Sequence, residues 1–242
     1  EATRTHGTSC SGSRFLNGTM ALHEELEARL ARFVGKDSAL VFSTGYQTNL
    51  GAISALIASG DRVYIDRYNH ASIMDGIFLA SGLQPKGAKY VRYKHNDMAD
   101  LERKLHKADA GEPRLIVTDG VFSMEGDIVR LREMRRLADK YQARIYLDEA
   151  HAIGVIGDTG RGTEEHHAAA KFADITMCTF SKSFGAIGGF IAGEAAVIDY
   201  IKHYARPLMF SASMPPATIA AVKASLAIIK QEPERVKRLQ TI

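Results

Sequence analysis

The sequence predicts an α/β fold in which a mostly parallel sheet lies between two layers of helices. Short apolar runs alternate with helical patterns along the 242-residue chain, which is typical of strands joined by crossover helices. The length suits one large α/β domain, and 45% hydrophobic with 24% charged residues is ordinary for a globular protein. Sheets of this kind bind ligands beyond the carboxyl ends of their strands. The residues directly after each strand are therefore the candidates for function.

The expected strands are short runs bounded by turn residues. They cover residues 39–42, 62–65, 89–93, 115–118, 144–147 and 175–178. Helical patterns with an apolar face lie between them, at residues 20–34, 46–58, 72–80, 98–106 and 131–141. The chain closes inside another amphipathic pattern, "PPATIAAVKASLAIIKQEPERVKRL", and we expect more chain on both sides.

Composition excludes several classes of protein. The net charge of +3 is small and evenly spread, so nucleic acid is not an expected partner. No apolar run approaches the length of a transmembrane segment, and no secretory signal is present. Cys10 and Cys178 are far apart and lack the spacing of metal ligands. We therefore expect a cytoplasmic protein without a metal site.

Polar and small side chains follow five of the expected strands. "STGYQTN" at residues 43–49 follows the first strand, and "DRYNHAS" with His70 follows the second. "TDGVFSMEGD" carries Ser123, "DEAHAIG" carries Asp148 and His151, and "TFSKS" carries Lys182. Because parallel strands end at one edge of the sheet, we expect these side chains to lie together.

Each of these residues has a purely structural alternative. His70 and Asp148 are suited to capping the helices that follow them, Ser123 to a turn, and Lys182 to extending into solvent. A glycine after a strand more often forms a turn than a phosphate site. These alternatives weaken when the residues are taken together, because all of them fall at one predicted edge.

Two nucleotide-binding motifs are absent. "RIYLDEAH" resembles the acidic strand end of an ATPase, but no G-x-x-x-x-G-K-[ST] phosphate loop occurs, and "VGKDS" does not supply one. "GDTGRG" does not match the dinucleotide fingerprint G-x-G-x-x-G. ATPase and dehydrogenase functions are therefore excluded.

A lysine, a carboxylate, a ring for stacking and a phosphate site together suit pyridoxal 5′-phosphate. A lysine amine condenses with its aldehyde to form a Schiff base. An aspartate beside the pyridine nitrogen favours the protonated nitrogen, and the charged ring withdraws electrons from the substrate. Backbone amides at a helix start, with hydroxyls, bind the phosphate. "STGYQTN" and "TFSKS" offer both, and Lys182 is the expected Schiff-base lysine.

Motifs along nearly the whole chain resemble the α-oxoamine synthases, which are fold-type I pyridoxal-phosphate enzymes. They are "GSRFLNGT", "FSTGYQTNLG", "NHASIMDGI", "TDGVFSMEGDI", "YLDEAHAIGVIGDTGRGT", "TFSKSFGAIGGF" and "MFSASMPPA". Within the family, three of these motifs look most like the bacterial serine palmitoyltransferases. The resemblance implies condensation of an amino acid with an acyl-coenzyme A and loss of carbon dioxide, with L-serine and palmitoyl-coenzyme A favoured. The alternatives within the family are the reactions of 2-amino-3-ketobutyrate ligase, 8-amino-7-oxononanoate synthase and 5-aminolevulinate synthase. Another fold-type I activity, such as that of an aminotransferase, and a non-catalytic regulatory paralogue are further alternatives.

The resemblance also implies residue roles. Lys182 would hold the cofactor and remove the Cα proton, Asp148 would pair with the pyridine nitrogen, and His151 would contact the ring hydroxyl. His70 would stack on the ring and hold the substrate carboxylate. The remaining expected cofactor contacts are Gly45, Tyr46, Ser123, Thr179, Ser181 and Ser211.

Ser211 would reach the phosphate of a neighbouring subunit, which implies a homodimer with shared sites. The resemblance identifies residues 1–242 as the large cofactor-binding domain, without the amino-terminal segment and the small carboxy-terminal domain of the family. A lipid substrate is also compatible with peripheral contact to a membrane.

Overall fold

The computed structural model describes residues 1–83, 87–109, 111–168 and 171–242. Within them, one seven-stranded sheet has the order β1-β7-β6-β5-β4-β2-β3. The strands are β1 Ser38–Phe42, β2 Arg62–Asp66, β3 Lys89–Tyr93, β4 Arg114–Asp119, β5 Ala143–Asp148, β6 Ile175–Thr179 and β7 Gly189–Gly193. All six strands expected from the sequence are present, with ends displaced by at most one residue. The expected three-layer α/β/α fold is confirmed.

The seventh strand was not predicted. β7 pairs antiparallel with both β1 and β6, whereas the pairs β2–β3, β2–β4, β4–β5 and β5–β6 are parallel. Its sequence, Gly-Phe-Ile-Ala-Gly, begins and ends with glycine, a residue that is depleted in strands. Burial on both faces of the sheet stabilises it despite that composition, since all five residues are buried.

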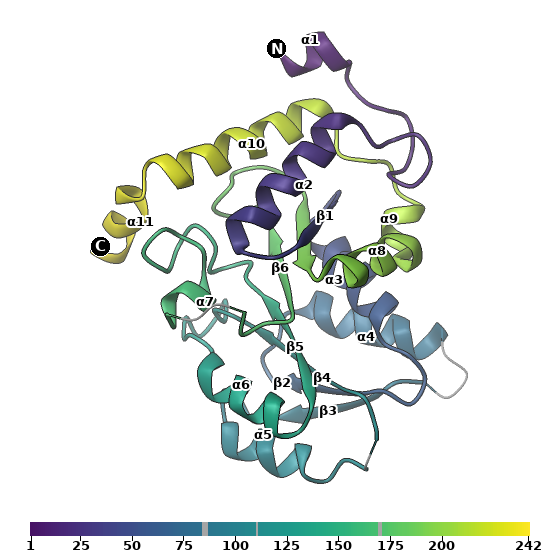
Figure 1. Ribbon diagram of the computed structural model, residues 1–242, viewed down its shortest axis with the longest axis vertical. Coiled ribbons are helices and arrows are strands. Elements are labelled where there is room, and N and C mark those ends of the chain that lie inside the picture. Colours follow the sequence, from purple (N-terminus) through teal and green to yellow (C-terminus); the bar gives the residue numbers. More distant parts are fainter. Residues whose placement is uncertain (84–86, 110, 169–170) are drawn as a thin grey trace.

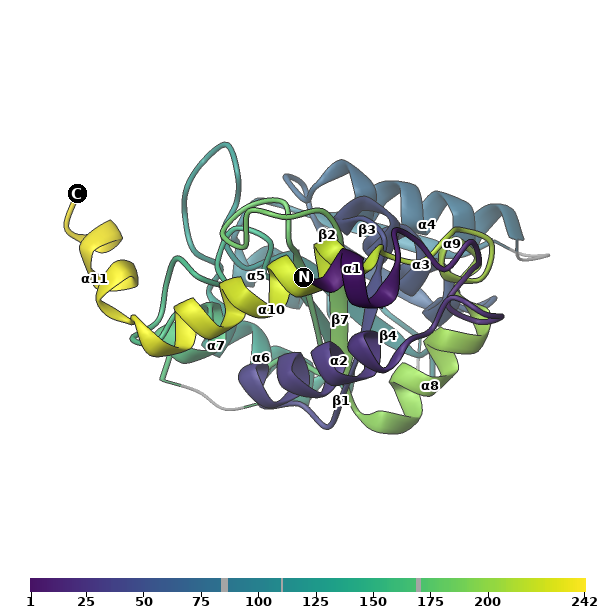
Figure 2. The same ribbon diagram turned by 90° about the horizontal axis from the view of Figure 1, so that it is seen from above.

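Helices cover both faces of the sheet (Figures 1 and 2). They are α1 Ala2–His6, α2 Ala21–Val34, α3 Gly45–Leu56, α4 Ala71–Leu83, α5 Met98–Leu105, α6 Leu131–Lys140, α7 Thr163–His166, α8 Ala195–Tyr204, α9 Arg206–Met209, α10 Pro216–Gln231 and α11 Glu234–Gln240. Figure 2 shows α4, α8 and α9 on one side of the strands and α6 and α10 on the other. The five helical patterns between the strands are confirmed, and so is the closing pattern, as α10 and α11.

The alternation of side chains along each strand builds a core on each face. On β1, Leu40 and Phe42 pack with residues of α3, α4 and α8, whereas Val41 packs on the other face with residues of α2 and α10. A third cluster on that second face joins α5 and α6 to β4 and β5. In the described residues, no helix has the length and apolar character to cross a membrane.

The fold brings the starts of α3 and α4 to the carboxyl edge of the sheet. The Thr44 side chain accepts a hydrogen bond from the Gln47 backbone amide at 3.1 Å and so caps α3. The contact between α3 and α4 is close, because a Cβ added to Gly76 would lie 3.0 Å from Cβ of Ile53. The loops after β1 and β2 therefore face the ends of β4, β5 and β6.

Candidate active site

A cavity of about 340 Å³ lies at the carboxyl ends of the parallel strands. Its walls come from the loops after β1, β2, β5 and β6 and from the last residues of β4, β5 and β6. The lining residues are Thr44, Gly45, Tyr46, Asn49, His70, Ser72, Asp119, Asp148, Ala150, Met177, Thr179, Ser181, Lys182, Ile187 and Gly188. Seven of the ten residues predicted from the sequence are among them: Gly45, Tyr46, His70, Asp148, Thr179, Ser181 and Lys182.

Two carboxyl groups stand side by side at the floor of this cavity. Asp119 and Asp148 end the neighbouring strands β4 and β5, are paired in register, and are 5% and 3% exposed. Burial, and then the charge of Asp148, raise the pKa of Asp119 well above its usual value. Two adjacent buried carboxylates do not both ionise readily. Burial and the neighbouring Asp148 therefore favour the protonated form of Asp119.

Asp148 is oriented by two donors from the protein. The Ala150 backbone amide donates to its Oδ1 at 3.0 Å, and the Asn49 side chain donates to its Oδ2 at 2.7 Å. These bonds use only part of the acceptor capacity of a carboxylate. Asp148 can thus accept a further N–H from a ligand in the cavity.

Lys182 lies in the turn between β6 and β7, at the rim of the cavity. The turn is closed by a hydrogen bond from the Gly185 amide to the Lys182 carbonyl at 3.0 Å, with Gly185 in the left-handed region at φ 61°. Burial lowers the pKa of Lys182, and the charge of Asp148 partly opposes this shift. A lowered pKa increases the fraction of neutral amine, which is the nucleophilic form.

His70 is exposed to the cavity at the start of α4. Its backbone amide donates to Asp119 Oδ2 at 3.1 Å, and its Nδ1 faces Ser72 Oγ at 2.7 Å. The Ser72 amide also donates to Nδ1 at 3.3 Å, so the ring does cap the helix. Capping uses only Nδ1, and Nε2 remains available for a ligand.

The start of α3 lies at the cavity with two backbone amides. The backbone amides of Gly45 and Tyr46 make no hydrogen bond within the described residues, as is usual for the first turn of a helix. A Cβ on Gly45 would lie 2.4 Å from Oγ1 of Thr179, so only glycine allows this approach. Thr179 Oγ1 lies 2.9 Å from Ser181 Oγ, and both hydroxyls face the same space.

Three predicted residues do not line the cavity. Ser123 is exposed in the loop after β4, and Ser211 accepts a hydrogen bond from the Gln47 side chain at 3.2 Å. His151 is half-buried beside the site, where burial and then the charge of Lys182 lower its pKa. The pKa of Tyr46, which does line the cavity, is raised by its hydrogen bond to Asp75.

Four polar residues of the cavity were not predicted as site residues, namely Thr44, Asn49, Ser72 and Asp119. Asp119 has a visible signal, because it ends a strand in "TDGVFS", like Asp148 in "LDEAH". Asn49 and Ser72 lie within helical patterns, where a polar side chain is normally assigned to solvent. Both are only 1% exposed.

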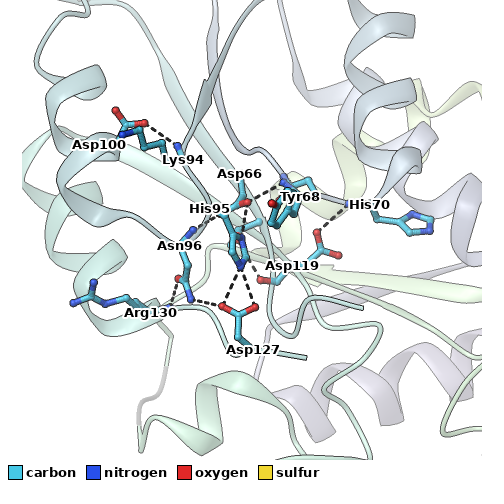
Figure 3. Close-up of polar contacts among 12 residues, drawn as sticks. Asp66, Tyr68, His70, Lys94, His95, Asn96, Asp100, Asp119, Asp127 and Arg130 are labelled. Atoms are coloured by element: carbon cyan, nitrogen blue, oxygen red, sulfur yellow. Dashed lines mark hydrogen bonds and ion pairs between the residues drawn. The ribbon is translucent and has the colours of Figure 1, made fainter. Parts of the chain in front are cut away.

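A second polar cluster lies beside the cavity (Figure 3). The His95 ring is placed between two carboxylates, with Nδ1 2.9 Å from Asp66 Oδ1 and Nε2 3.1 Å from both oxygens of Asp127. Asp66 ends β2, four residues before His70, and Asp127 follows Ser123 by four residues. His95 therefore links the loops that carry two predicted site residues.

The fold and this cavity together define an α/β protein with the start of a helix, a lysine and a buried aspartate at one sheet edge. The model of the family described as aminotransferase class I and II matches residues 2–241. The chain belongs to that family.

Individual relatives show which members of the family the chain resembles. The chain is 49% identical over 239 residues to serine palmitoyltransferase of Sphingobacterium spiritivorum, covering 99% of this chain and 58% of the relative. It is 45% identical over 239 residues to 8-amino-7-oxononanoate synthase of Bacillus pumilus, covering 99% of this chain and 59% of the relative. The chain thus spans somewhat more than half the length of these relatives. The resemblance to the α-oxoamine synthases is confirmed.

Solved structures agree. The structure of Sphingomonas wittichii serine palmitoyltransferase superposes with a TM-score of 0.93 at 38% identity, covering 99% of this chain and 59% of that one. A structure of SPT with a PLP internal aldimine gives the same values. The 8-amino-7-oxononanoate synthase of Francisella tularensis has a TM-score of 0.82 at 28% identity, covering 99% of this chain and 65% of that one.

Proposed function

We propose that the protein binds pyridoxal 5′-phosphate and uses it to condense an amino acid with an acyl-coenzyme A, releasing coenzyme A and carbon dioxide. The observation that carries this proposal is the convergence of Lys182, Asp148, His70 and the start of α3 on one cavity. Relatives that carry out such condensations support it, as does the solved relative with the cofactor bound.

The residues present fit this cofactor. The amides of Gly45 and Tyr46, with the hydroxyls of Thr179 and Ser181, would hold the phosphate. Asp148 retains acceptor capacity for the pyridine N–H, and the charge on Asp148 favours the protonated nitrogen. When bound, the cofactor supplies an electron sink that stabilises a carbanion at the substrate Cα.

Lys182 has two tasks in this proposal. Its amine holds the cofactor before substrate arrives and then accepts the Cα proton. The lowered pKa serves both tasks, because each needs the unprotonated amine. His151 would contact the ring hydroxyl and Ser123 would lie near it.

His70 would stack on the cofactor ring while its Nε2 donates to the substrate carboxylate. A new C–C bond forms between the amino-acid Cα and the thioester carbonyl carbon as the C–S bond breaks and coenzyme A leaves. The bond from Cα to the carboxyl carbon then breaks, carbon dioxide leaves, and Cα regains a proton. The product is a 2-amino ketone.

L-Serine and palmitoyl-coenzyme A are the substrates we propose, giving 3-ketodihydrosphingosine, the first intermediate of sphingolipid synthesis. Identities of 49–50% to serine palmitoyltransferases of Sphingobacterium and Bacteroides support this choice. A second candidate is the 8-amino-7-oxononanoate synthase reaction, because the Bacillus pumilus enzyme is 45% identical. A non-catalytic regulatory role is disfavoured by the presence of Lys182.

We further propose that residues 1–242 form the large cofactor-binding domain of each subunit, and that two subunits form a homodimer with shared active sites. Ser211 does not line the cavity of its own chain, and the neighbouring Phe210 is 72% exposed. Both features are expected of residues that meet a second subunit. A cytoplasmic protein in peripheral contact with a membrane fits the proposed lipid product.

The test uses the full-length protein. Borohydride reduction and peptide mapping are expected to find cofactor attached to the peptide that contains Lys182. Lys182→Ala should lose both the absorption of the lysine-bound cofactor and the label, whereas Lys230→Ala, on the exposed side of α10, should keep both. A label on another lysine would refute the assignment. Assays of serine, glycine and alanine with short and long acyl-coenzyme A then identify the substrates.

A further inference from the structure

The buried side-chain amide of Asn49 connects Asp148 with Ser72, the residue that contacts the His70 ring. The Asn49 side chain donates through Nδ2 to Asp148 Oδ2 at 2.7 Å and to Ser72 Oγ at 2.9 Å. Its Oδ1 accepts a hydrogen bond from the Tyr146 hydroxyl at 2.8 Å. All four side chains belong to residues that are at most 3% exposed, so water does not compete for these bonds.

The direction of each bond follows from the chemistry of its partners. An ionised carboxylate only accepts hydrogen bonds, so the amide of Asn49 must turn its NH₂ group toward Asp148. This orientation places Oδ1 against Tyr146, whose hydroxyl stays protonated because burial raises its pKa well above the usual value. The second N–H of Asn49 then points to Ser72 Oγ.

The hydroxyl of Ser72 is oriented by its two neighbours, Asn49 and His70. Because Ser72 Oγ accepts from Asn49, its one proton is free to point to His70 Nδ1, 2.7 Å away. Nδ1 also receives the Ser72 backbone N–H at 3.3 Å. With two donors directed at it, Nδ1 is the unprotonated nitrogen, and the ring proton lies on Nε2.

We propose that Ser72, oriented by Asn49, is a positioning residue that holds His70 in the Nε2–H form and aims this donor at the carboxylate of the amino-acid substrate. This inference rests on the proposed function only for the identity of the ligand. Asn49 binds both Ser72 and Asp148, so the carboxylate that faces the cofactor nitrogen and the ring that faces the substrate share one buried support.

The first test is a double-mutant cycle in the full-length holoenzyme, read from the serine-induced change in cofactor absorption. Ser72→Ala should weaken serine binding about five- to tenfold, as expected for one lost hydrogen bond, and should leave cofactor binding unchanged. In the His70→Phe background the same change should alter serine binding less than about twofold, because coupled residues are not additive. Equal weakening in both backgrounds would mean that Ser72 acts without His70.

Ser81→Ala is the matched control. Ser81 lies on the same helix, and its hydroxyl donates to the Ile77 carbonyl at 2.9 Å. We expect no change in serine binding from this substitution. An equal loss in Ser81→Ala would attribute the Ser72 effect to the helix as a whole and refute the proposal.

The second test needs no substrate. Long-range ¹H–¹⁵N spectra of histidine-labelled protein, with His70 assigned by comparison with His70→Phe, report which ring nitrogen carries the proton. Wild type is expected to show Nε2–H alone and Ser72→Ala a mixture. A proton on Nδ1 in wild type overturns the inference about Ser72, even if serine binds. Conversely, wild type that holds His70 as described but gives no response to any amino acid refutes the proposed function alone.

Discussion

His95 offers the sharpest test of how the loops around the site are held. Its two ring nitrogens face Asp66 and Asp127 (Figure 3), which suits a ring that is protonated on both sides. The centroid of the Tyr68 ring lies 4.6 Å from that of the His95 ring, in a tilted arrangement. The Phe122 ring meets the His95 ring edge-on, with 4.5 Å between the centroids. The perturbation is His95→Gln, which removes the charge and keeps a side chain able to donate one hydrogen bond.

Most of the expected loss in the free energy of unfolding comes from the contact between His95 and Asp66. The Asp66 side chain is 1% exposed and that of His95 is 19% exposed, so this charged hydrogen bond contributes about 1.5–3 kcal/mol. The outer partner Asp127 is 39% exposed, and its ion pair adds at most about 1 kcal/mol. Asp66 keeps backbone donors from Tyr68 and Asn96. We therefore expect a loss of about 2–3 kcal/mol, or roughly 5–10 °C in the midpoint of thermal unfolding.

The sign of the pH dependence follows from the pKa shift. The hydrogen bonds and charges of Asp66 and Asp127 oppose desolvation and raise the pKa of His95. A folded pKa above the unfolded value of about 6.5 means that the contribution is complete below about pH 6.5. It is lost as the pH rises through the folded pKa, because a neutral ring must then present a lone pair to one carboxylate.

The assay is urea unfolding of wild type, His95→Gln and the control His106→Gln from about pH 5.5 to pH 9. His106 is an exposed histidine just after α5, and its replacement should have little effect at any pH. The difference between wild type and His95→Gln should be largest at low pH and shrink at high pH. A difference that is constant across this range would show that His95 contributes shape and not charge, and would contradict the charged contact between His95 and Asp66.

Two further predictions concern the cavity. Asp148→Asn should slow exchange of the serine Cα proton in deuterated water by orders of magnitude, at tenfold for each ~1.4 kcal/mol lost. Asp119→Asn should slow this exchange less than about threefold, because an amide resembles a protonated carboxylic acid. Equal effects of the two variants would contradict the different roles of the two carboxyl groups. Gly45→Ala should weaken cofactor binding at least about tenfold, since its Cβ would lie 2.4 Å from Thr179 Oγ1. The control Gly82→Ala, with nothing within 4 Å of the added Cβ, should leave cofactor binding unchanged. Cofactor affinity is measured by fluorescence titration, and unchanged affinity in Gly45→Ala would show that the start of α3 does not bind the phosphate.

Five of the six predicted strands are short apolar runs that are mostly buried, whereas β3 at the sheet edge is mostly exposed. β5 has the buried run Ile145 to Leu147 and ends at a carboxylate, and β2 has the same form with Val63 to Ile65 ending at Asp66. Local composition is sufficient in such cases. β7 differs in two ways. It pairs antiparallel with both neighbours, of which β1 is distant in sequence, and two of its five residues are glycines.

β7 also shows why direction could not be inferred from the alternation of strands and helices. A parallel connection needs a crossover of a dozen or more residues, whereas only nine residues separate Thr179 from Gly189. The short connection forces an antiparallel return, and Lys182 lies within it. The turn that carries the lysine is therefore held at both ends by neighbouring strands, which restricts where its amine can reach.

The chemistry-bearing residues of the site were predictable from their place after strands, but the residues that orient them were not. Asp148 and His70 are separated by 78 positions in the sequence, and nothing local to either indicates that Asn49 and Ser72 join them. That connection exists only because α3 packs against α4 above the end of β5. A polar residue within a helical pattern is solvent-exposed unless such packing encloses it, and then it requires partners. Buried asparagine and serine side chains on α3 and α4 are thus a consequence of tertiary contact, and their substitution should affect the orientation of the site more than the formation of the helices.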